Sequence, residues 1–214
     1  KNKGFDMRII YIHGLDSTEN SVKGVLLQKY CNTHHAGIEV IRPDLNESPD
    51  KVFARLCELV QQAKEADNKV VVMGSSLGGY FASLVSNETS CPAILLNPST
   101  KPHISLQRFV DDQVIDSIAC DDGADTVIYR TTGGWAMTLK DLDWFSAHKL
   151  QQITHPEKLF VVIKQGDELL DPKVAADFYQ SQGAEVALQA GGDHRMTDFE
   201  QQLPMIMEHL LSLA

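Results

Sequence analysis

The sequence lacks the features that mark several large classes of protein. No apolar run approaches the roughly eighteen residues that cross a membrane. Basic residues are few, with 19 Lys and Arg against 29 Asp and Glu, which gives a formal net charge of -10. Nucleic acids and anionic membranes select basic surfaces, so we expect neither as a partner. The patterns G-x-x-x-x-G-K-S/T and G-x-G-x-x-G are both absent, so nothing favours a nucleotide site.

Cysteine is also scarce, and its four copies are scattered at residues 31, 57, 91 and 120. They form no C-x-x-C pair, and no histidine lies at a ligand spacing from them. We therefore expect free thiols in a reducing cytoplasm. The sequence as a whole implies no metal and no organic cofactor. A short polar lead, "KNKGFD", passes directly into an apolar run. This pattern is not that of a signal peptide, and we expect Met7 to be the natural start.

What the 214 residues do contain is an alternation of apolar, β-rich runs with helical patterns. Strands are expected at residues 8–13, 38–43, 69–74, 93–98, 159–165 and 185–190. Helices are expected at residues 20–30, 49–65, 77–86, 172–182 and 198–213, with Ser48 and Asp171 as N-caps before Pro49 and Pro172. Several strands are apolar throughout, as in sheets covered on both faces. The order predicts a single α/β domain with a parallel sheet and helices on both faces.

Residues 101–156 interrupt this rhythm, because they contain no convincing central strand. We expect an insertion within the domain that folds as helices over one end of the sheet. Its apolar residues, among them Trp135, Trp144 and Phe145, suit either an acyl pocket or simple core packing. Residues 101–130 hold six aspartates against three basic residues. These aspartates would disfavour an anionic substrate such as an acyl-CoA if they faced the site; otherwise they solvate the outside of the insertion.

The stretch "VVVMGSSLGGYFASLV" places Gly74, Ser76 and Gly78 as G-x-S-x-G between a strand and a helix. A serine at the tip of such a turn exposes its Oγ above the carboxyl edge of the sheet. The flanking glycines give the clearance that the sharp turn needs, and the N–H of Leu77 then points to where an oxyanion would form. Ser76, and not Ser75, has the right spacing on both sides. A plain glycine turn is the alternative.

A nucleophilic serine needs a base and a group that orients the base, and on such a sheet the order is serine, acid, histidine. The late strands end in "QGDELLDP" and "GGDHRM", which offer Asp167 as the acid and His194 as the base. Asp167 could instead only cap a turn. Asp171 competes for its role but suits the N-cap before Pro172, Glu168 is a weaker candidate, and Asp193 adjoins the histidine too closely to orient it.

The second oxyanion donor is expected after the first strand, where the chain reads "YIHGLDS". Gly14 permits a tight approach there, and the backbone N–H of Leu15 is the candidate donor. His13 is better placed to brace this loop than to act as a base.

With these pieces in order, the chain resembles the α/β-hydrolase superfamily and, within it, the small YqiA-like bacterial esterases. The resemblance is carried by "IIYIHGLDS", "GSSLGGYFAS", "ILLNPS", "GDELLD" and "GGDHRM", and less clearly by "TTGGWAMTL". It implies a three-layer α/β/α sandwich of the α/β-hydrolase type, with a reduced, mostly parallel sheet and a helical lid at residues 101–156. Its implied site residues are the triad Ser76, Asp167 and His194, the oxyanion donors Leu15 and Leu77, and substrate contacts from Gly14, Asn97 and Trp135. The family usually has an aromatic residue where Leu15 stands, so we expect the acyl pocket of this chain to differ from the family's.

The expected function is a serine hydrolase that cleaves carboxylic esters of small or medium acyl chains through an acyl-enzyme intermediate. One alternative is a thioesterase of the acyl-CoA type, which differs only in the leaving group. Another is a non-catalytic pseudo-hydrolase that binds a small ester or a partner protein, although that role would not require all three triad residues. Monomer and homo-oligomer stay open.

Overall fold

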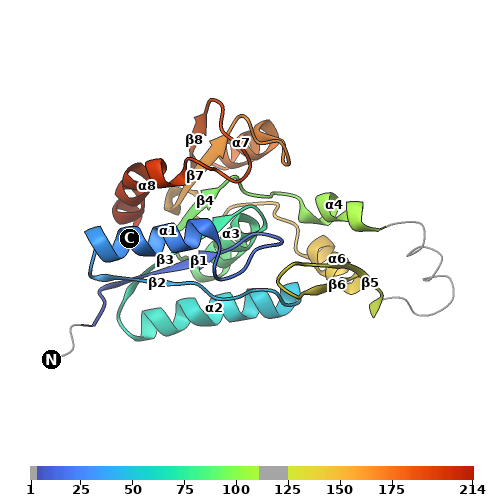
Figure 1. The fold of residues 1–214 in the computed structure, drawn as a ribbon, viewed down its shortest axis with the longest axis horizontal. Helices are drawn as coiled ribbons and strands as arrows, with labels where there is room; N and C mark the ends of the chain where they lie inside the picture. Colours follow the sequence, from blue (N-terminus) through green and yellow to red (C-terminus); the bar gives the residue numbers. More distant parts are fainter. Residues whose placement is uncertain (1–3, 111–124) are drawn as a thin grey trace.

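The computed structural model describes residues 4–110 and 125–214, and its centre is a six-stranded parallel sheet (Figure 1). The strand order is β2–β1–β3–β4–β7–β8, and every neighbouring pair is parallel. The bounds are β1 Met7–Ile12, β2 Ile38–Ile41, β3 Lys69–Ser75, β4 Ala93–Leu96, β7 Leu159–Lys164 and β8 Glu185–Gln189. All six predicted strands are present, and the predicted parallel sheet is confirmed.

Helices cover both faces of this sheet. They are α1 Val22–His34, α2 Pro49–Glu65, α3 Leu77–Thr89, α7 Pro172–Ser181 and α8 Phe199–Leu213. Alternate residues of β1 point to opposite faces, as the pleat requires. Ile10 and Ile12 pack in one core with α2, α3 and α7, whereas Ile9 and Tyr11 pack in the other with α1 and α8. The predicted three-layer α/β/α sandwich is therefore confirmed, with α1 and α2 on opposite sides of the sheet in Figure 1.

Two of these helices begin at prolines, as predicted. The Asp171 carboxylate caps α7 by accepting hydrogen bonds from the N–H groups of Lys173 and Val174. Ser48 occupies the N-cap position of α2 but makes no side-chain cap hydrogen bond. The Ser48 hydroxyl instead donates a hydrogen bond to the Asp50 carboxylate, and this bond lowers the pKa of that carboxyl. The position of this cap was thus predictable, but its hydrogen bond was not.

The insertion between β4 and β7 gathers at one end of the molecule (Figure 1). Its described elements are α4 Pro102–Ser105, a 3-10 turn at Leu106–Phe109, β5 Val127–Arg130, β6 Ala136–Thr138, α6 Leu139–Ala147 and a 3-10 turn at Pro156–Lys158. Besides the expected helices it contains an antiparallel hairpin, β5–β6, whose strands are too short for their periodicity to stand out. Five of the six aspartates singled out above lie at residues 111–124, outside the described residues.

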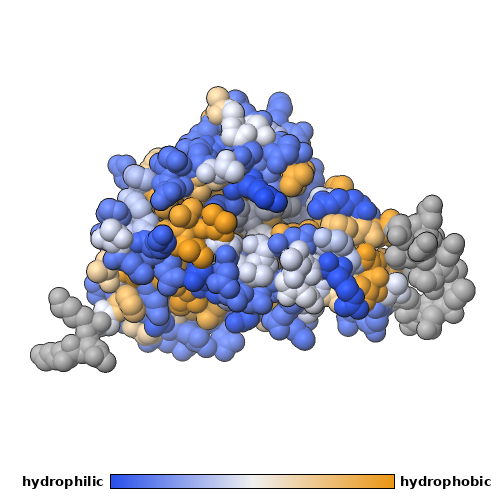
Figure 2. All heavy atoms as spheres, viewed as in Figure 1, coloured by the Kyte–Doolittle hydropathy of each residue, from blue (hydrophilic) through white to orange (hydrophobic). Residues whose placement is uncertain are grey.

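Most of the face seen in Figure 2 is hydrophilic, with hydrophobic patches set among polar residues. Three of the most exposed large apolar side chains, Val22, Ile104 and Leu169, lie in segments that follow β1, β4 and β7. They therefore lie beyond the carboxyl ends of these strands. Within the described residues, no helix has the length and apolar character that crossing a bilayer requires. Cys31, Cys57 and Cys91 are free thiols, and Cys120 lies outside the described residues.

Candidate active site

Ser76 lies on the sharp turn between β3 and α3. Its backbone has φ 56° and ψ -120°, a conformation that costs a non-glycine residue on the order of 1–3 kcal/mol. Surrounding backbone groups hold it there. The Ser76 N–H donates to the carbonyl of Leu96 at 3.0 Å, and the Ser76 carbonyl accepts from the N–H of Ser99 at 2.9 Å. The turn therefore presents the Ser76 hydroxyl in a defined direction above the carboxyl edge of the sheet.

The glycines on both sides of this serine allow backbone segments to touch. A Cβ atom on Gly74 would lie 2.1 Å from the carbonyl oxygen of Gly78. A Cβ atom on Gly78 would lie 2.1 Å from the carbonyl oxygen of Ile12 in β1. Real Cβ atoms do not come this close to backbone oxygens, so both positions require glycine. The spacing noted in the sequence thus has a steric cause.

The structure brings the three predicted triad residues together from the ends of β3, β7 and β8. The Oγ atom of Ser76 lies 3.0 Å from Nε2 of His194, and Nδ1 of His194 lies 2.8 Å from Oδ2 of Asp167. The His194 side chain is 12% exposed and that of Asp167 is 3% exposed. A neutral imidazole that donates from Nδ1 to the carboxylate leaves Nε2 as the acceptor for the serine hydroxyl.

Asp167 is held as an ionised acceptor. Its Oδ1 atom accepts hydrogen bonds from the N–H groups of Leu169 and Leu170, both at 2.9 Å. Burial alone would raise the pKa of this carboxyl, but the hydrogen bonds from His194, Leu170 and Leu169 outweigh burial and lower the pKa below its usual value. Oδ2 is thereby directed at the imidazole.

The rival acids do not contact the imidazole. Asp171 caps α7, and the Asp193 carboxylate accepts from the N–H and hydroxyl of Thr197. Glu168 accepts a hydrogen bond from the backbone N–H of His194 at 2.9 Å, so it holds the loop rather than the ring.

Asn97, predicted from the resemblance as a substrate contact, is only 2% exposed and is bonded on all sides by the protein. Its Nδ2 atom donates to the carbonyls of Asp193 and His194, both at 3.0 Å, and its Oδ1 atom accepts from the N–H of Lys164 at 2.8 Å. This side chain joins the end of β7 to the histidine loop. Its positive φ of 41° suits asparagine better than most residues.

The predicted oxyanion donors flank Ser76. Gly14 approaches so closely that a Cβ atom there would lie 3.1 Å from the Ser75 carbonyl and 3.3 Å from Cβ of Ser76. Neither the N–H of Leu15 nor that of Leu77 donates to another of the described residues. Within the described residues, both amides are therefore without a hydrogen-bond acceptor.

His13 braces this loop, as predicted. Its Nε2 atom accepts from the backbone N–H of Leu45 at 3.0 Å, so Nδ1 carries the proton and donates to the Gly14 carbonyl at 2.9 Å. In a trans peptide the carbonyl and the following N–H point in opposite directions. The bond to the Gly14 carbonyl thus orients the N–H of Leu15.

A pocket opens beside the backbone of Gly14, Leu15 and Leu77. Its apolar wall consists of Leu15, Leu45, Val52, Leu77, Phe81 and Trp135, and its polar wall consists of His13, Asn46, Glu47 and Thr131. Trp135, a predicted substrate contact, reaches it from the turn of the inserted hairpin, and its indole N–H donates to Asp141 at 3.2 Å. Burial raises the pKa of Asp141 despite its hydrogen bonds from Thr138 and Trp135. Trp135 is itself buried and belongs to the hydrophobic core together with Met137 and Phe145, so it lines the pocket as part of that core.

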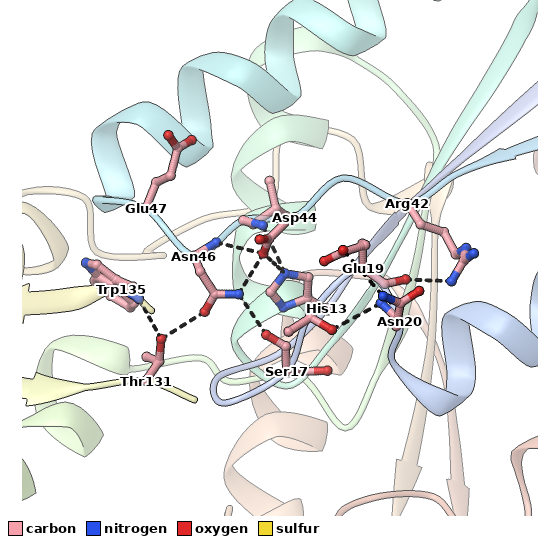
Figure 3. Close-up of polar contacts among 12 residues, drawn as sticks. His13, Ser17, Glu19, Asn20, Arg42, Asp44, Asn46, Glu47, Thr131 and Trp135 are labelled. Atoms are coloured by element: carbon pink, nitrogen blue, oxygen red, sulfur yellow. Dashed lines mark hydrogen bonds and ion pairs between the residues drawn. The ribbon is translucent and has the colours of Figure 1, made fainter. Parts of the chain in front are cut away.

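Apart from His13, sequence reasoning assigned no role to the polar residues around this pocket. Asn46, drawn with its contacts in Figure 3, follows β2, the edge neighbour of β1, and that position was the one available signal. For a metal, the described residues contain no group of three His, Cys, Asp or Glu side chains that could hold one.

Residues 8–211 match the sequence pattern of a family described as "Uncharacterised protein family (UPF0227)". The chain belongs to this family. Est1E from Butyrivibrio proteoclasticus superposes with a TM-score of 0.74 at 16% identity, covering 100% of this chain and 90% of Est1E. An esterase domain from Rhodothermus marinus gives 0.65 at 14%, covering 99% and 88% of the two chains. A serine hydrolase without lid from Xanthomonas campestris gives 0.60 at 11%, covering 97% and 83%.

These identities are low, so the superpositions establish the fold of this UPF0227 member and not its chemistry. The fold is that of the α/β hydrolases. The resemblance drawn from the sequence is therefore confirmed at the level of family and fold.

Proposed function

We propose that the protein is a serine esterase that cleaves carboxylic esters of small or medium acyl chains. The observation that carries this proposal is the hydrogen-bonded chain from Ser76 through His194 to Asp167, with links of 3.0 and 2.8 Å. A non-catalytic binding protein has no need for a serine held in a strained turn beside a correctly oriented imidazole. The esterases among the structural neighbours agree with this reaction class.

In the proposed reaction Ser76 Oγ attacks the ester carbonyl while His194 Nε2 takes the hydroxyl proton. The N–H groups of Leu15 and Leu77 stabilise the oxyanion of the tetrahedral intermediate. Its collapse breaks the bond to the alcohol, which leaves with the proton from His194. Water then attacks the acyl-serine while His194 takes a proton from that water. His194 returns the proton to Ser76 Oγ as the carboxylic acid leaves.

The pocket beside the oxyanion amides is the proposed site for the acyl chain. Its wall is apolar, and Trp135 closes it from the insertion. The alcohol would leave toward the carboxyl edge of the sheet, where the segments after β4 and β7 carry the exposed apolar side chains Ile104 and Leu169. This arrangement suits an uncharged substrate. In this reaction Asn97 positions the histidine loop, a role that we prefer to substrate contact because of its three protein partners.

Labelling with a fluorophosphonate probe, read by peptide mass spectrometry, tests the nucleophile. We expect an adduct on Ser76 in the wild type, none in Ser76→Ala, and strongly slowed labelling in His194→Ala. Ser75→Ala is the matched control, because this neighbouring serine is 6% exposed and should leave labelling intact. Folded wild type that reacts neither with this probe nor with a smaller sulfonyl fluoride would favour the pseudo-hydrolase.

A panel of p-nitrophenyl esters and acyl-CoA thioesters of matched chain length then compares the two leaving groups. We expect higher kcat/KM for the esters. The reverse order would make the protein a thioesterase that uses the same residues. A cytoplasmic location stays a prediction and is read separately, by fractionation of cells that express the chain.

A further inference from the structure

The residue after the oxyanion donor Leu15 is Asp16, and its carboxylate is bonded entirely to the inserted hairpin. Oδ2 accepts from the hydroxyl of Tyr129 at 2.5 Å. Oδ1 accepts from the backbone N–H of Thr132 at 2.9 Å and, at 3.4 Å, from its hydroxyl. Asp16 has a φ of 58°, a left-handed conformation that aspartate tolerates better than most residues. A local backbone bend thus aims the carboxylate at residues more than a hundred positions away.

The donor Tyr129 is itself held in place. Its ring stacks on that of Phe109, with centroids 3.9 Å apart and planes 17° apart. The hydrogen bond to Asp16 raises the pKa of the Tyr129 hydroxyl, which therefore stays protonated and donating. The hydroxyl thus has a fixed position from which to hold the loop.

A second bridge joins the same two segments through Asn46, drawn in Figure 3. Its Nδ2 atom donates to the carbonyl of Ser17 at 2.9 Å, and its Oδ1 atom accepts from the hydroxyl of Thr131 at 2.9 Å. Gly133 packs so tightly on it that a Cβ atom there would lie 2.0 Å from Nδ2. The loop at residues 14–17, which we call the oxyanion loop, is therefore bonded to the hairpin at both Asp16 and Ser17.

These contacts act on the peptide that would stabilise the oxyanion. On its N-terminal side, His13 holds the Gly14 carbonyl. On its C-terminal side, Asp16 is the next residue, and no described hydrogen bond other than those from the hairpin reaches its carboxylate. An oxyanion donor works only when its direction is set before the reaction. Exposed loops move unless they are tied to other elements.

We propose that Asp16 is a positioning residue, which holds the Leu15 amide in its oxyanion-binding direction by clamping the oxyanion loop to Tyr129 and Thr132 of the inserted hairpin. The inference rests on the proposed esterase function. It gives the insertion a role in the reaction besides closing the acyl pocket, because the same hairpin also carries Trp135.

Two conservative variants test the clamp. Tyr129→Phe removes the hydroxyl but keeps the ring that stacks on Phe109. Asp16→Asn keeps the size of the side chain, its tolerance of positive φ and one acceptor oxygen, but loses the charge. Tyr30→Phe is the matched control, because this tyrosine lies on α1 and no described hydrogen bond involves its hydroxyl.

Three measurements separate positioning from general stability: kcat and KM for p-nitrophenyl butyrate, the inhibition constant of an alkyl trifluoromethyl ketone, and hydrogen exchange of the peptide covering residues 12–20. The ketone forms an oxyanion on the serine, so its affinity reports on the two amides. We expect each variant to lower kcat by about three- to tenfold, with KM within twofold, and to weaken the ketone by the same factor. Hydrogen exchange of the 12–20 peptide should become faster. Because both changes break the same interaction, the double variant should lose no more kcat than the more impaired of the two single variants.

Wild-type kcat, ketone affinity and exchange in both variants would overturn the clamp while leaving the esterase intact. An equal loss in Tyr30→Phe would also overturn it. The proposed function fails differently: a wild type that neither labels with fluorophosphonate nor cleaves any ester would remove the esterase and, with it, the catalytic role of Asp16.

Discussion

The two sides of the candidate site are held by different kinds of contact. On the nucleophile side, Ser76 is fixed by backbone segments that touch at Gly74 and Gly78. On the pocket side, the oxyanion loop is held by side-chain hydrogen bonds, from Tyr129 to Asp16 and from Asn46, which Thr131 holds in turn, to the Ser17 carbonyl. Backbone contact leaves no room for any side chain, whereas a side-chain bond can be weakened by degrees. Substitutions should therefore be severe on the first side and graded on the second.

The largest loss of activity is expected on the nucleophile side, from Asp167→Asn. An amide there no longer selects the tautomer in which Nε2 of His194 accepts the serine proton, and kcat should fall by about 10⁴-fold. Steady-state hydrolysis of p-nitrophenyl butyrate measures it. Asp193→Asn is the matched control, because the carboxylate of this neighbour of the histidine accepts hydrogen bonds from Thr197 and the Met196 backbone and does not contact the imidazole. A comparable loss in that variant would show that the acid has been assigned to the wrong residue.

The largest loss of stability is expected from Gly78→Ala, since its Cβ would lie 2.1 Å from the Ile12 carbonyl. Relief requires the turn to separate from β1, which we expect to lower the free energy of unfolding by about 3 kcal/mol or more. Gly24→Ala is a second helical glycine for comparison. Its nearest neighbours are the side chains of Ser21, Tyr11 and Arg42 at 3.0–3.1 Å, which can shift. Urea unfolding of both variants checks the difference, and equal losses would contradict the steric account.

The same division explains what could be predicted from the sequence. The turn at Ser76 was predictable because its cause is local: two glycines at fixed spacing between an apolar strand and a helix. The order of the late loops likewise predicted that Asp167 and His194 lie at the same edge of the sheet as Ser76. The bridge from Asp16 to Tyr129 was not predictable, because it joins residues 113 positions apart and Tyr129 lies outside every motif quoted above. The inserted hairpin was missed because its strands, four and three residues long, are not the continuous buried apolar run that reveals the equally short β4.

Asn97→Asp should lower kcat less than Asp167→Asn does. Asn97 joins the end of β7 to the histidine loop and does not contact the Ser76 turn or the pocket through its side chain. The aspartate keeps the acceptor for the Lys164 N–H but presents an oxygen to the carbonyls of Asp193 and His194. Losing these donors should displace the histidine loop and cost about 1–3 kcal/mol in transition-state stabilisation, a fall of about ten- to a hundredfold in kcat. Ser99→Ala, another buried polar position near the strand end, should leave kcat within twofold. If both variants behave alike, the loop does not depend on Asn97.

On the pocket side, Trp135→Ala should change selectivity more than rate. Removing the indole lengthens the acyl pocket, so kcat/KM should shift toward longer acyl chains by about tenfold across the p-nitrophenyl acetate to octanoate series. Trp135→Phe keeps an aromatic wall but loses the hydrogen bond to Asp141, and should shift the optimum far less. An unchanged chain-length profile in Trp135→Ala would place the acyl chain elsewhere.

The smallest effect is expected in the pH dependence of stability. It is measured for one carboxylate on each side, Asp167 on the nucleophile side and Asp141 on the pocket side. The folded protein lowers the pKa of Asp167, so its contribution is present above the unfolded pKa and is lost as pH falls through the lower folded value. Burial raises the pKa of Asp141, so between its unfolded and folded pKa values the unfolded chain ionises first and stability falls as pH rises. Urea unfolding between about pH 3 and pH 6 measures this. As pH increases, the free energy of unfolding of the wild type should rise relative to that of Asp167→Asn and fall relative to that of Asp141→Asn. Trends of the same sign in both comparisons would contradict the idea that hydrogen bonding dominates around Asp167 and burial around Asp141.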